Sequence, residues 1–179
     1  PSLAVLVSAR VGRGYAKIIF FNRRGNINHL YFPRFFQTFR CVEKIVNSGI
    51  KANLLIAFNV LPHVPNLNDF ILGMKKIIDK KGIIVVQFSA YLLDVIQKCE
   101  FDMVYHEHFS YFSLFTLKKI FESVNLEIFD TEEISVHGGS LRLFIKSKDN
   151  VDLRIEDKVK KILKKEEELG LQKISTYLE

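Results

Sequence analysis

Apolar residues along the chain form two patterns, almost continuous short runs and positions spaced three and four apart. Almost continuous runs occupy residues 3–7, 54–58 and 83–88, which is typical of strands buried on both faces of a parallel sheet. Between the second and third runs the spacing is helical, with one apolar face made of Leu67, Phe70, Ile71, Met74, Ile77 and Ile78. The order strand, helix, strand predicts a βαβ unit and therefore an α/β fold.

Polar residues mark both ends of the helix in this unit. Asn66 precedes the apolar face and can cap the helix, with Asp69 at the third position. Lysines gather at the other end, where they suit the helix dipole, and Gly82 is expected to end the helix. The polar side chains Asn59 and His63 follow the strand before it, at the edge where open parallel sheets bind ligands.

The remaining segments follow from the same signals. We expect a loop over residues 22–34, helices over 36–48, over 91–98, from Thr116 onward and from Val151 onward, and strands over 126–129, 134–136 and 141–146. The last helix is amphipathic and either rests on the domain or packs on another part of a longer protein. Its charged run, residues 158–168, predicts a solvated face.

Composition places the chain among ordinary globular proteins. It has 179 residues, 48% apolar and 26% charged, which is enough for one domain with a core. No run of about 18 apolar residues lacks charges, so we expect no membrane span. The two cysteines, Cys41 and Cys99, form no CxxC motif, which argues for a reducing compartment and against a thiolate zinc site. We therefore expect a cytoplasmic protein.

Charge is distributed unevenly. The first 42 residues contain seven basic side chains and no carboxylate, since the first acidic residue is Glu43. A basic segment of this kind can bind nucleic acid or anionic lipid. A solvated basic face is the simpler interpretation, so we predict neither a nucleic-acid nor a membrane partner.

Closely spaced glycines follow the first apolar run. Gly12 and Gly14 flank Arg13, and a strand followed by such a turn and a helix lets the backbone approach a nucleotide-like ligand. Nucleotide-binding folds usually add an acidic residue about 20 positions later, which holds ribose hydroxyls, and this residue is absent here. The glycines alone are a weak signal for a cofactor site.

The densest group of reactive side chains lies in FDMVYHEHFSYFSL, residues 101–114. If this segment is extended, His106 and His108 share one face and Glu107 takes the other, because alternate side chains point the same way. The shared face could hold a base or a metal ion. Aromatic neighbours would exclude water and make a histidine pKa easier to shift. Further ligands for a metal are not obvious in the sequence.

Three segments carry a family resemblance. NVLPHVPNLNDF at 59–70, FDMVYHEHFSYFSL at 101–114 and HGGSLRLF at 137–144 resemble blocks of S-adenosylmethionine-dependent sugar C-methyltransferases, which methylate C3 of a nucleotide-activated keto sugar. The resemblance runs from about residue 35 to residue 179. It implies a Rossmann-like class I methyltransferase fold, a doubly wound and mostly parallel sheet with flanking helices. It also implies S-adenosylmethionine as cofactor and a nucleotide sugar as substrate.

The resemblance also implies roles for individual residues. His108 is the expected base that forms an enolate, and the enolate attacks the methyl group of the cofactor. The other expected catalytic residues are Tyr105, Glu107 and His63. We expect the cofactor to contact Gly12, Gly14 and Asn59, and the substrate to contact His106, Tyr111, His137 and Arg142. For His106, His137 and Arg142 a purely structural role is an equal alternative.

The N-terminal part departs from the family pattern. The first motif appears as SARVGRG without its acidic residue, the second strand looks shortened, and Gln87 and Ser89 replace a common Glu and Pro. We therefore divide the chain into a degenerate N-terminal remnant (1–34), a methyltransferase core (35–150) and the start of a truncated C-terminal domain (151–179). The resulting hypotheses are a remodelled enzyme, an inactive remnant, a product of truncation or frame-shift, and a non-catalytic module that binds a sugar nucleotide or another anion.

Overall fold

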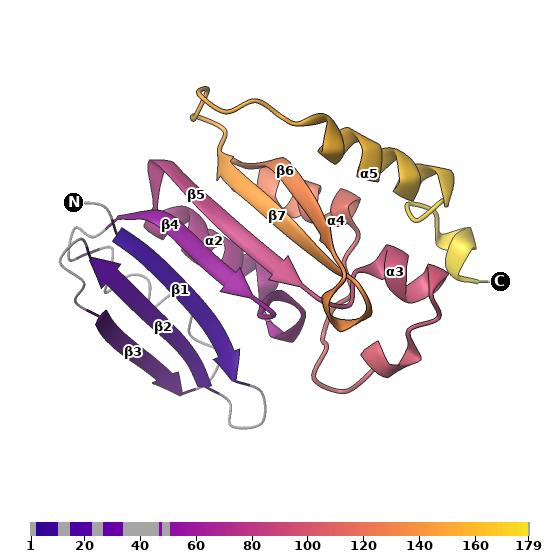
Figure 1. Ribbon diagram of the computed structural model, residues 1–179, viewed down its shortest axis with the longest axis horizontal. Helices are drawn as coiled ribbons and strands as arrows, with labels where there is room; N and C mark the ends of the chain where they lie inside the picture. The colour runs from indigo at the N-terminus through magenta and orange to yellow at the C-terminus, as the bar shows by residue number, and fades with distance from the viewer. Residues whose placement is uncertain (1–2, 11–14, 23–26, 34–46, 48–50, 179) are drawn as a thin grey trace.

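One seven-stranded mixed sheet organises the structure. The computed structural model describes residues 3–10, 15–22, 27–33, 47 and 51–178, the first three ranges as backbone strands. Across the sheet the strands are β3 (Ile27–Pro33), β2 (Tyr15–Asn22), β1 (Leu3–Arg10), β4 (Ala52–Phe58), β5 (Ile78–Phe88), β7 (Ser140–Ser147) and β6 (Leu126–Ile134) (Figure 1). The expected helix over 36–48 lies outside the described residues, apart from Asn47, which is helical.

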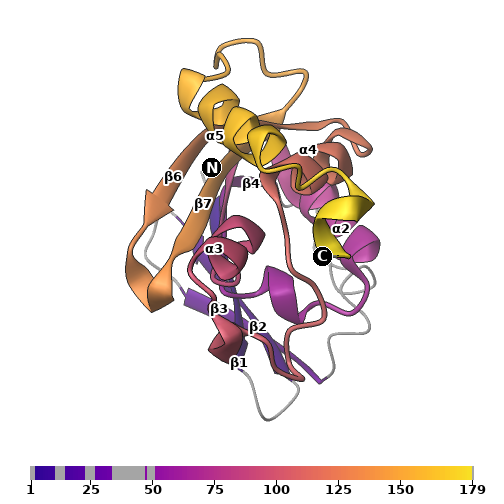
Figure 2. The same cartoon turned by 90° about the vertical axis from the view of Figure 1, so that its right-hand side faces the viewer.

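Helices and short 3-10 turns connect the strands. The helices are α2 (Leu67–Ile77), α3 (Leu92–Gln97), α4 (Leu114–Glu122) and α5 (Asp157–Glu168). The turns are η2 (Leu61–His63), η3 (Phe101–Met103), η4 (Val136–Gly138) and η5 (Ile174–Tyr177). Figure 2 shows α2 and α4 on one side of the sheet, with α5 running beside α4. No helix among the described residues is long and apolar enough to cross a membrane.

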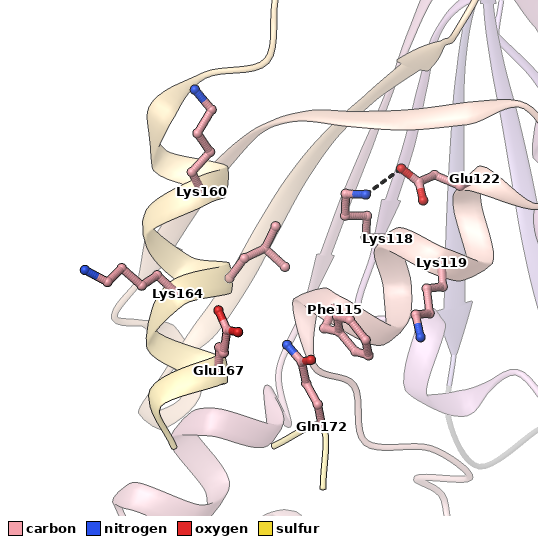
Figure 3. A pocket seen from close by; sticks show the side chains of 9 residues that line it. Phe115, Lys118, Lys119, Glu122, Lys160, Lys164, Glu167 and Gln172 are labelled. Carbon is pink, nitrogen blue, oxygen red and sulfur yellow. Dashed lines mark hydrogen bonds and ion pairs between the residues drawn. The ribbon is translucent and has the colours of Figure 1, made fainter. Parts of the chain in front are cut away.

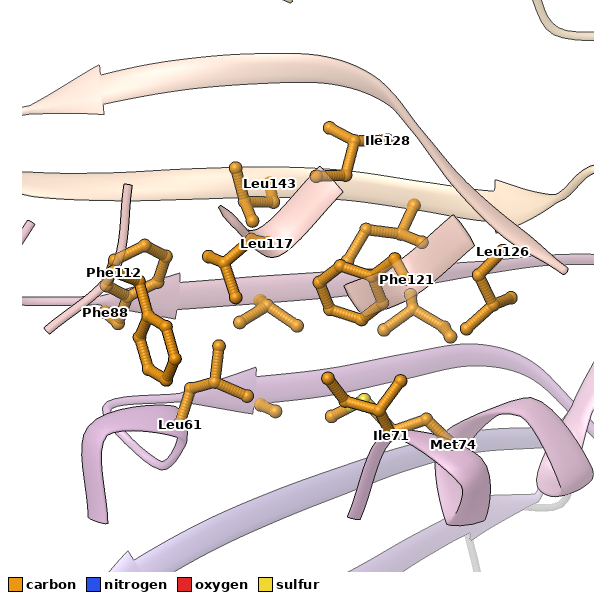
Figure 4. Packing of buried hydrophobic residues seen from close by; sticks show 14 of the residues in the cluster. Leu61, Ile71, Met74, Phe88, Phe112, Leu117, Phe121, Leu126, Ile128 and Leu143 are labelled. Atoms are coloured by element: carbon orange, nitrogen blue, oxygen red, sulfur yellow. The ribbon is translucent and has the colours of Figure 1, made fainter. Parts of the chain in front are cut away.

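The core lies between the sheet and these helices. Side chains from η2, α2, α4 and the central strands interlock there (Figure 4), among them Leu61, Ile71, Met74, Phe88, Leu117, Phe121, Leu126 and Leu143. Each of these side chains is at most 3% exposed. The apolar residues that sequence periodicity assigned to the helix after Asn66 and to the helix near Thr116 thus face one common core, as predicted.

Strand direction differs from the predicted, mostly parallel sheet. Only the centre is parallel, where β1 pairs with β4 and β4 with β5. On one side β1, β2 and β3 form an antiparallel meander, and on the other side β7 runs antiparallel between β5 and β6. Parallel neighbours need a crossover of a dozen or more residues, whereas four residues separate each pair in the meander, so only hairpins fit.

The meander overturns two predictions for the N-terminal part. The segment after the glycines is strand β2, whereas a nucleotide-binding turn would lead into a helix, and most of the expected loop over 22–34 is strand β3. Ile18, Ile19, Phe20 and Phe21 give β2 the β-branched and aromatic content that strands prefer. Gly12 and Gly14 lie outside the described residues, between the antiparallel strands β1 and β2.

The βαβ unit forms as predicted, with a correction at the end of its helix. The Asn66 side chain accepts a hydrogen bond from the Asp69 N–H and caps α2. The helix ends at Ile77, however, and Gly82 lies inside β5 rather than at a helix end. A Cβ on Gly82 would lie 2.7 Å from the Ala52 carbonyl oxygen, so the close approach of β4 requires glycine.

Three further boundaries shift. The N-cap of α4 is Ser113, three residues before the expected cap Thr116, and its side chain accepts a hydrogen bond from the Thr116 N–H. The two short strands expected over 126–136 are one strand, β6. The segment 101–114 is not extended: it contains η3 and a turn closed by a bond from the His108 N–H to the Tyr105 carbonyl.

Helix α5 begins at Asp157, six residues later than the expected start at Val151. It rests on the domain, which was one of the two alternatives for this segment. Val159 and Ile162 enter the core. The prediction of a solvated charged face is wrong at one residue, because Glu166 is fully buried. Its carboxylate accepts hydrogen bonds from the Leu114 and Phe115 N–H groups, at the amino end of α4, and from the Tyr91 hydroxyl.

Candidate functional site

The candidate site lies where the chain leaves the carboxyl ends of β4 and β5. Asn59 follows β4 with a φ of 51°, a left-handed conformation that asparagine tolerates, and its N–H donates to the Gln87 carbonyl at 2.7 Å. This turn directs the chain into η2, which carries His63. The end of β4 thereby fixes the direction of one expected catalytic residue.

Two hydrogen bonds join η2 to the segment 101–114. The Phe109 N–H donates to the Pro62 carbonyl at 2.8 Å, and His63 Nδ1 lies 2.9 Å from the Glu107 carbonyl oxygen. These bonds place the ring centroids of His63 and His108 4.8 Å apart. Residues 45 positions apart in the sequence therefore form one site.

His108 is buried, with 8% of its surface exposed, and its orientation is fixed. Its Nδ1 lies 2.9 Å from the Met103 carbonyl oxygen. A carbonyl can only accept, so Nδ1 carries the proton, and in the neutral ring Nε2 is left as an acceptor. The same argument applies to His63 and the Glu107 carbonyl. Both imidazoles thus present a basic nitrogen.

The surroundings of His108 favour its neutral form. Burial lowers the pKa of His108, and the neighbouring His63 lowers it further, while the bond to the Met103 carbonyl and the charge of Glu107 act in the opposite direction. The Tyr105 ring lies 4.3 Å from the His108 ring, between centroids. Burial and the Glu107 charge raise the pKa of Tyr105, so its hydroxyl keeps its proton.

His106 does not share a face with His108, so the predicted alternation is wrong. The turn at Tyr105–His108 sends the His106 side chain outward, where it is 89% exposed, while His108 turns inward. His106 Nε2 lies 4.0 Å from a Glu107 carboxylate oxygen. The described residues contain no group of three or more His, Cys, Asp or Glu side chains placed to hold a metal ion.

Arg142 is engaged within the sheet. Its Nε and Nη2 donate to Gln87 Oε1 at 3.1 and 2.7 Å, and its Nη1 donates to Glu132 Oε2 at 2.9 Å. Phe58, Gln87, Arg142 and Glu132 are cross-strand neighbours on β4, β5, β7 and β6, so they form one row on one face. Three of the five guanidinium N–H donors are thus used by the protein.

The loop of His137 is held by helix α3. Lys98 donates to the Gly138 carbonyl at 2.9 Å, and Gly138 and Gly139 have φ values of 79° and 155°. The His137 side chain lies outside the described part of the structure. Whether His137 and Arg142 contact substrate stays a prediction.

A groove of about 430 Å³ between α4 and α5 lies apart from these residues (Figure 3). Four lysines and Phe115 line it, but Lys118 is paired with Glu122 and Lys160 with Asp157. None of the predicted site residues contributes to its wall.

Three participants in the site were missed from the sequence. The carbonyl groups of Met103 and Glu107 orient the two imidazoles, and backbone groups leave no signal in residue identity. Gln87 was noted only as a departure from the family pattern, although it anchors both the Asn59 turn and Arg142.

Comparison with known proteins decides the family. A methyltransferase domain profile matches residues 8–131, and a C-methyltransferase C-terminal domain profile matches residues 135–179. The chain belongs to the S-adenosylmethionine-dependent C-methyltransferases. This confirms the predicted resemblance, the Rossmann-like class I methyltransferase fold and S-adenosylmethionine as the family's cofactor.

Individual relatives of this methyltransferase cover it only in part. C-methyltransferase NovU of Streptomyces niveus is 31% identical over 137 residues, which is 76% of this chain and 32% of NovU, so the chain spans about a third of that relative. Among solved structures, the magnesium protoporphyrin IX methyltransferase of Synechocystis PCC 6803 is 19% identical, with a TM-score of 0.41 over 55% of this chain and 47% of its own. A putative methyltransferase in complex with Haloferax volcanii Trm112 gives a TM-score of 0.45 at 8% identity over 54% and 55%.

The described residues of this methyltransferase fit the family's cofactor on one side only. Asn59 Oδ1 at the end of β4 is buried without a hydrogen-bond partner among the described residues, as expected of an acceptor reserved for a ligand. Strands β1, β2 and β3 contain no carboxylate that could hold the ribose hydroxyls of the cofactor. Because β2 is antiparallel, its carboxyl end at Asn22 pairs with Leu3, at the opposite edge of the sheet from the end of β1.

Proposed function

We propose that this chain carries the proton-abstracting site of a C-methyltransferase that acts on a nucleotide-activated keto sugar. The supporting observation is the His63–His108 pair. Each Nδ1 is bound to a backbone carbonyl, which leaves each Nε2 as an acceptor at the carboxyl edge of the sheet. A fixed, neutral imidazole whose pKa is lowered by burial suits a general base at neutral pH.

The proposed step is removal of a proton from the carbon beside the ketone. The proton goes to His108 Nε2, and the electron pair of the broken C–H bond forms the enolate. The enolate oxygen needs a donor, and Tyr105 fits this role because its hydroxyl stays protonated. His63 Nε2 in the neutral ring has no proton to donate, so we assign His63 to holding the Glu107 carbonyl and the loop. S-adenosylmethionine, when bound, supplies an electrophilic methyl group for the new carbon–carbon bond.

The base can be tested without methyl transfer. Wild-type protein is incubated in D2O with a nucleotide-activated keto sugar, and deuterium uptake beside the ketone is followed by mass spectrometry. A general base contributes typically 10²–10⁴-fold, so H108Q is expected to slow uptake by about 10²-fold or more. The control variant H106Q, which replaces the exposed neighbouring histidine, should slow deuterium uptake far less.

Two outcomes would contradict the proposal. Uptake in H108Q equal to that of wild type would remove His108 as the base. Wild-type protein that is folded and binds the sugar nucleotide but exchanges no proton would support the alternative, a non-catalytic binding module. That alternative is supported by the basic side chains of the first 42 residues and by the absence from β1, β2 and β3 of a carboxylate for the ribose hydroxyls.

Methyl transfer is measured separately. With S-adenosylmethionine present, the product should gain one methyl group, and calorimetry gives the cofactor affinity. Exchange without methyl transfer would mean that the base works while the chain lacks a competent cofactor site. This result fits the meander, which provides no carboxylate at the edge where the ribose would lie.

A further inference from the structure

Tyr111 and His108 share one acceptor, the carbonyl oxygen of Met103. The Tyr111 hydroxyl donates to this oxygen at 3.2 Å, and His108 Nδ1 donates at 2.9 Å. The two rings meet edge to face, with centroids 6.0 Å apart and planes at 82°. A carbonyl oxygen has two lone pairs, so it can accept both bonds at once.

We propose that Tyr111 is a positioning residue, which holds the Met103 carbonyl for His108 and limits how basic His108 becomes, rather than a substrate contact. This inference rests on the proposed role of His108 as the base. Two donors on one oxygen weaken each other, because each draws electron density from the acceptor. The carbonyl therefore stabilises a protonated His108 less than it would alone.

The other groups around His108 do not replace this effect. His63 approaches from η2 and disfavours the protonated ring, whereas the Glu107 carboxylate and the Met103 carbonyl favour it. The Tyr105 ring is tilted by 44° relative to the His108 ring, with centroids 4.3 Å apart, and no bond links its hydroxyl to the Met103 oxygen in the described structure. Of these neighbours, Tyr111 alone acts on the acceptor that fixes the Nδ1 proton.

The test is a pH titration of His108 by NMR, with 15N-labelled histidine and with H108Q to identify the signal. In Y111F the ring and its packing remain while the hydroxyl is lost, so Met103 accepts from His108 alone. The bond from His108 Nδ1 to the Met103 carbonyl then strengthens, so we expect the His108 pKa to rise by about 0.3 unit. The matched control is Y177F, because the Tyr177 hydroxyl also donates to a backbone carbonyl, that of Leu171, at 2.7 Å. Its His108 titration should equal that of wild type.

A His108 pKa that is unchanged or lower in Y111F would overturn the proposal. A second measurement needs no variant: the 15N shifts of neutral His108 in wild type should show the proton on Nδ1, and a proton on Nε2 would also overturn it. Neither experiment contains substrate or cofactor. Failure of this inference is therefore distinguishable from failure of the proposed reaction, which the deuterium uptake of wild-type protein reports.

Discussion

The buried carboxylate of Glu166 should hold α5 on the domain. It accepts three hydrogen bonds, from the Leu114 N–H at 2.6 Å, the Phe115 N–H at 2.9 Å and the Tyr91 hydroxyl at 2.8 Å. The two N–H groups belong to the first turn of α4, where no intrahelical acceptor exists. Without Glu166, these donors lose their acceptor in the interior.

The magnitude follows from those donors. A buried donor left unpaired costs about 1–3 kcal/mol, and removing one partner of a buried charged network typically costs about 3–5 kcal/mol. We expect E166A to lower the free energy of unfolding by about 3–5 kcal/mol, since water entering the space offsets part of the sum. E166Q keeps one carbonyl oxygen but turns an amide N–H₂ towards a donor, so it should lose about 1–2 kcal/mol.

Urea unfolding at neutral pH measures these differences. The matched control is E167A, which removes the adjacent and exposed carboxylate on the same helix and should change stability by less than about 0.5 kcal/mol. If E166A were no less stable than E167A, the carboxylate would not be what holds α5 to α4. If E166Q had a lower free energy of unfolding than E166A, the hydrogen-bond reasoning would be refuted.

Two further predictions concern stability. Burial raises the pKa of Glu166 above its ordinary value of 4.5, so the folded protein binds a proton at this carboxyl group more readily than the unfolded chain does. The contribution of this titration to stability is present below pH 4.5 and is lost as pH rises through the folded pKa. The difference in unfolding free energy between wild type and E166Q should therefore narrow with rising pH, and a widening difference in urea titrations would contradict this. The variant N66A, which removes the N-cap of α2, should have a free energy of unfolding about 1 kcal/mol lower than wild type in the same urea assay. The control N68A changes an exposed residue in the first turn of α2 and should alter it by less than about 0.5 kcal/mol. Equal effects of the two substitutions would count against the role of Asn66 as a cap.

Local signals predicted the centre of the fold correctly. The apolar run of β4, the cap and apolar face of α2 and the run of β5 each depend on residues close in sequence. Strand direction in the meander depends instead on connection length and on the aromatic and β-branched residues of β2. The glycine pattern before β2 was a weak signal for a nucleotide-binding turn, and the β-propensity of residues 18–21 was not used to predict a strand.

The burial of Glu166 could have been predicted in part. It lies seven residues after Val159, four after Ile162 and three after Leu163, so helical periodicity places it on the apolar face of α5. Composition alone assigned the whole run to solvent. Its partners could not be inferred, because the amino end of α4 lies about 50 residues away in sequence and meets α5 only in the folded chain.

The segment 101–114 was also predicted only in part. Residue identities and the resemblance pointed to His108 and His63, and the structure brings their rings together. The alternating pattern failed, because η3 and the turn after it replace the assumed strand. What orients the two imidazoles is a pair of backbone carbonyls, whose positions depend on that turn.

The two sides of the proposed site therefore depend on different parts of the chain. The proton-abstracting side is built from loops after β4 and β5, which the parallel centre of the sheet places at one edge. The ribose side would depend on β2, whose carboxyl end lies at the opposite edge because the strand is antiparallel. An acidic residue introduced at Asn22 would thus be at the wrong edge of the sheet. At the carboxyl edge, the described residues offer Asn59 Oδ1, a buried acceptor without a hydrogen-bond partner, which we propose as a contact for S-adenosylmethionine.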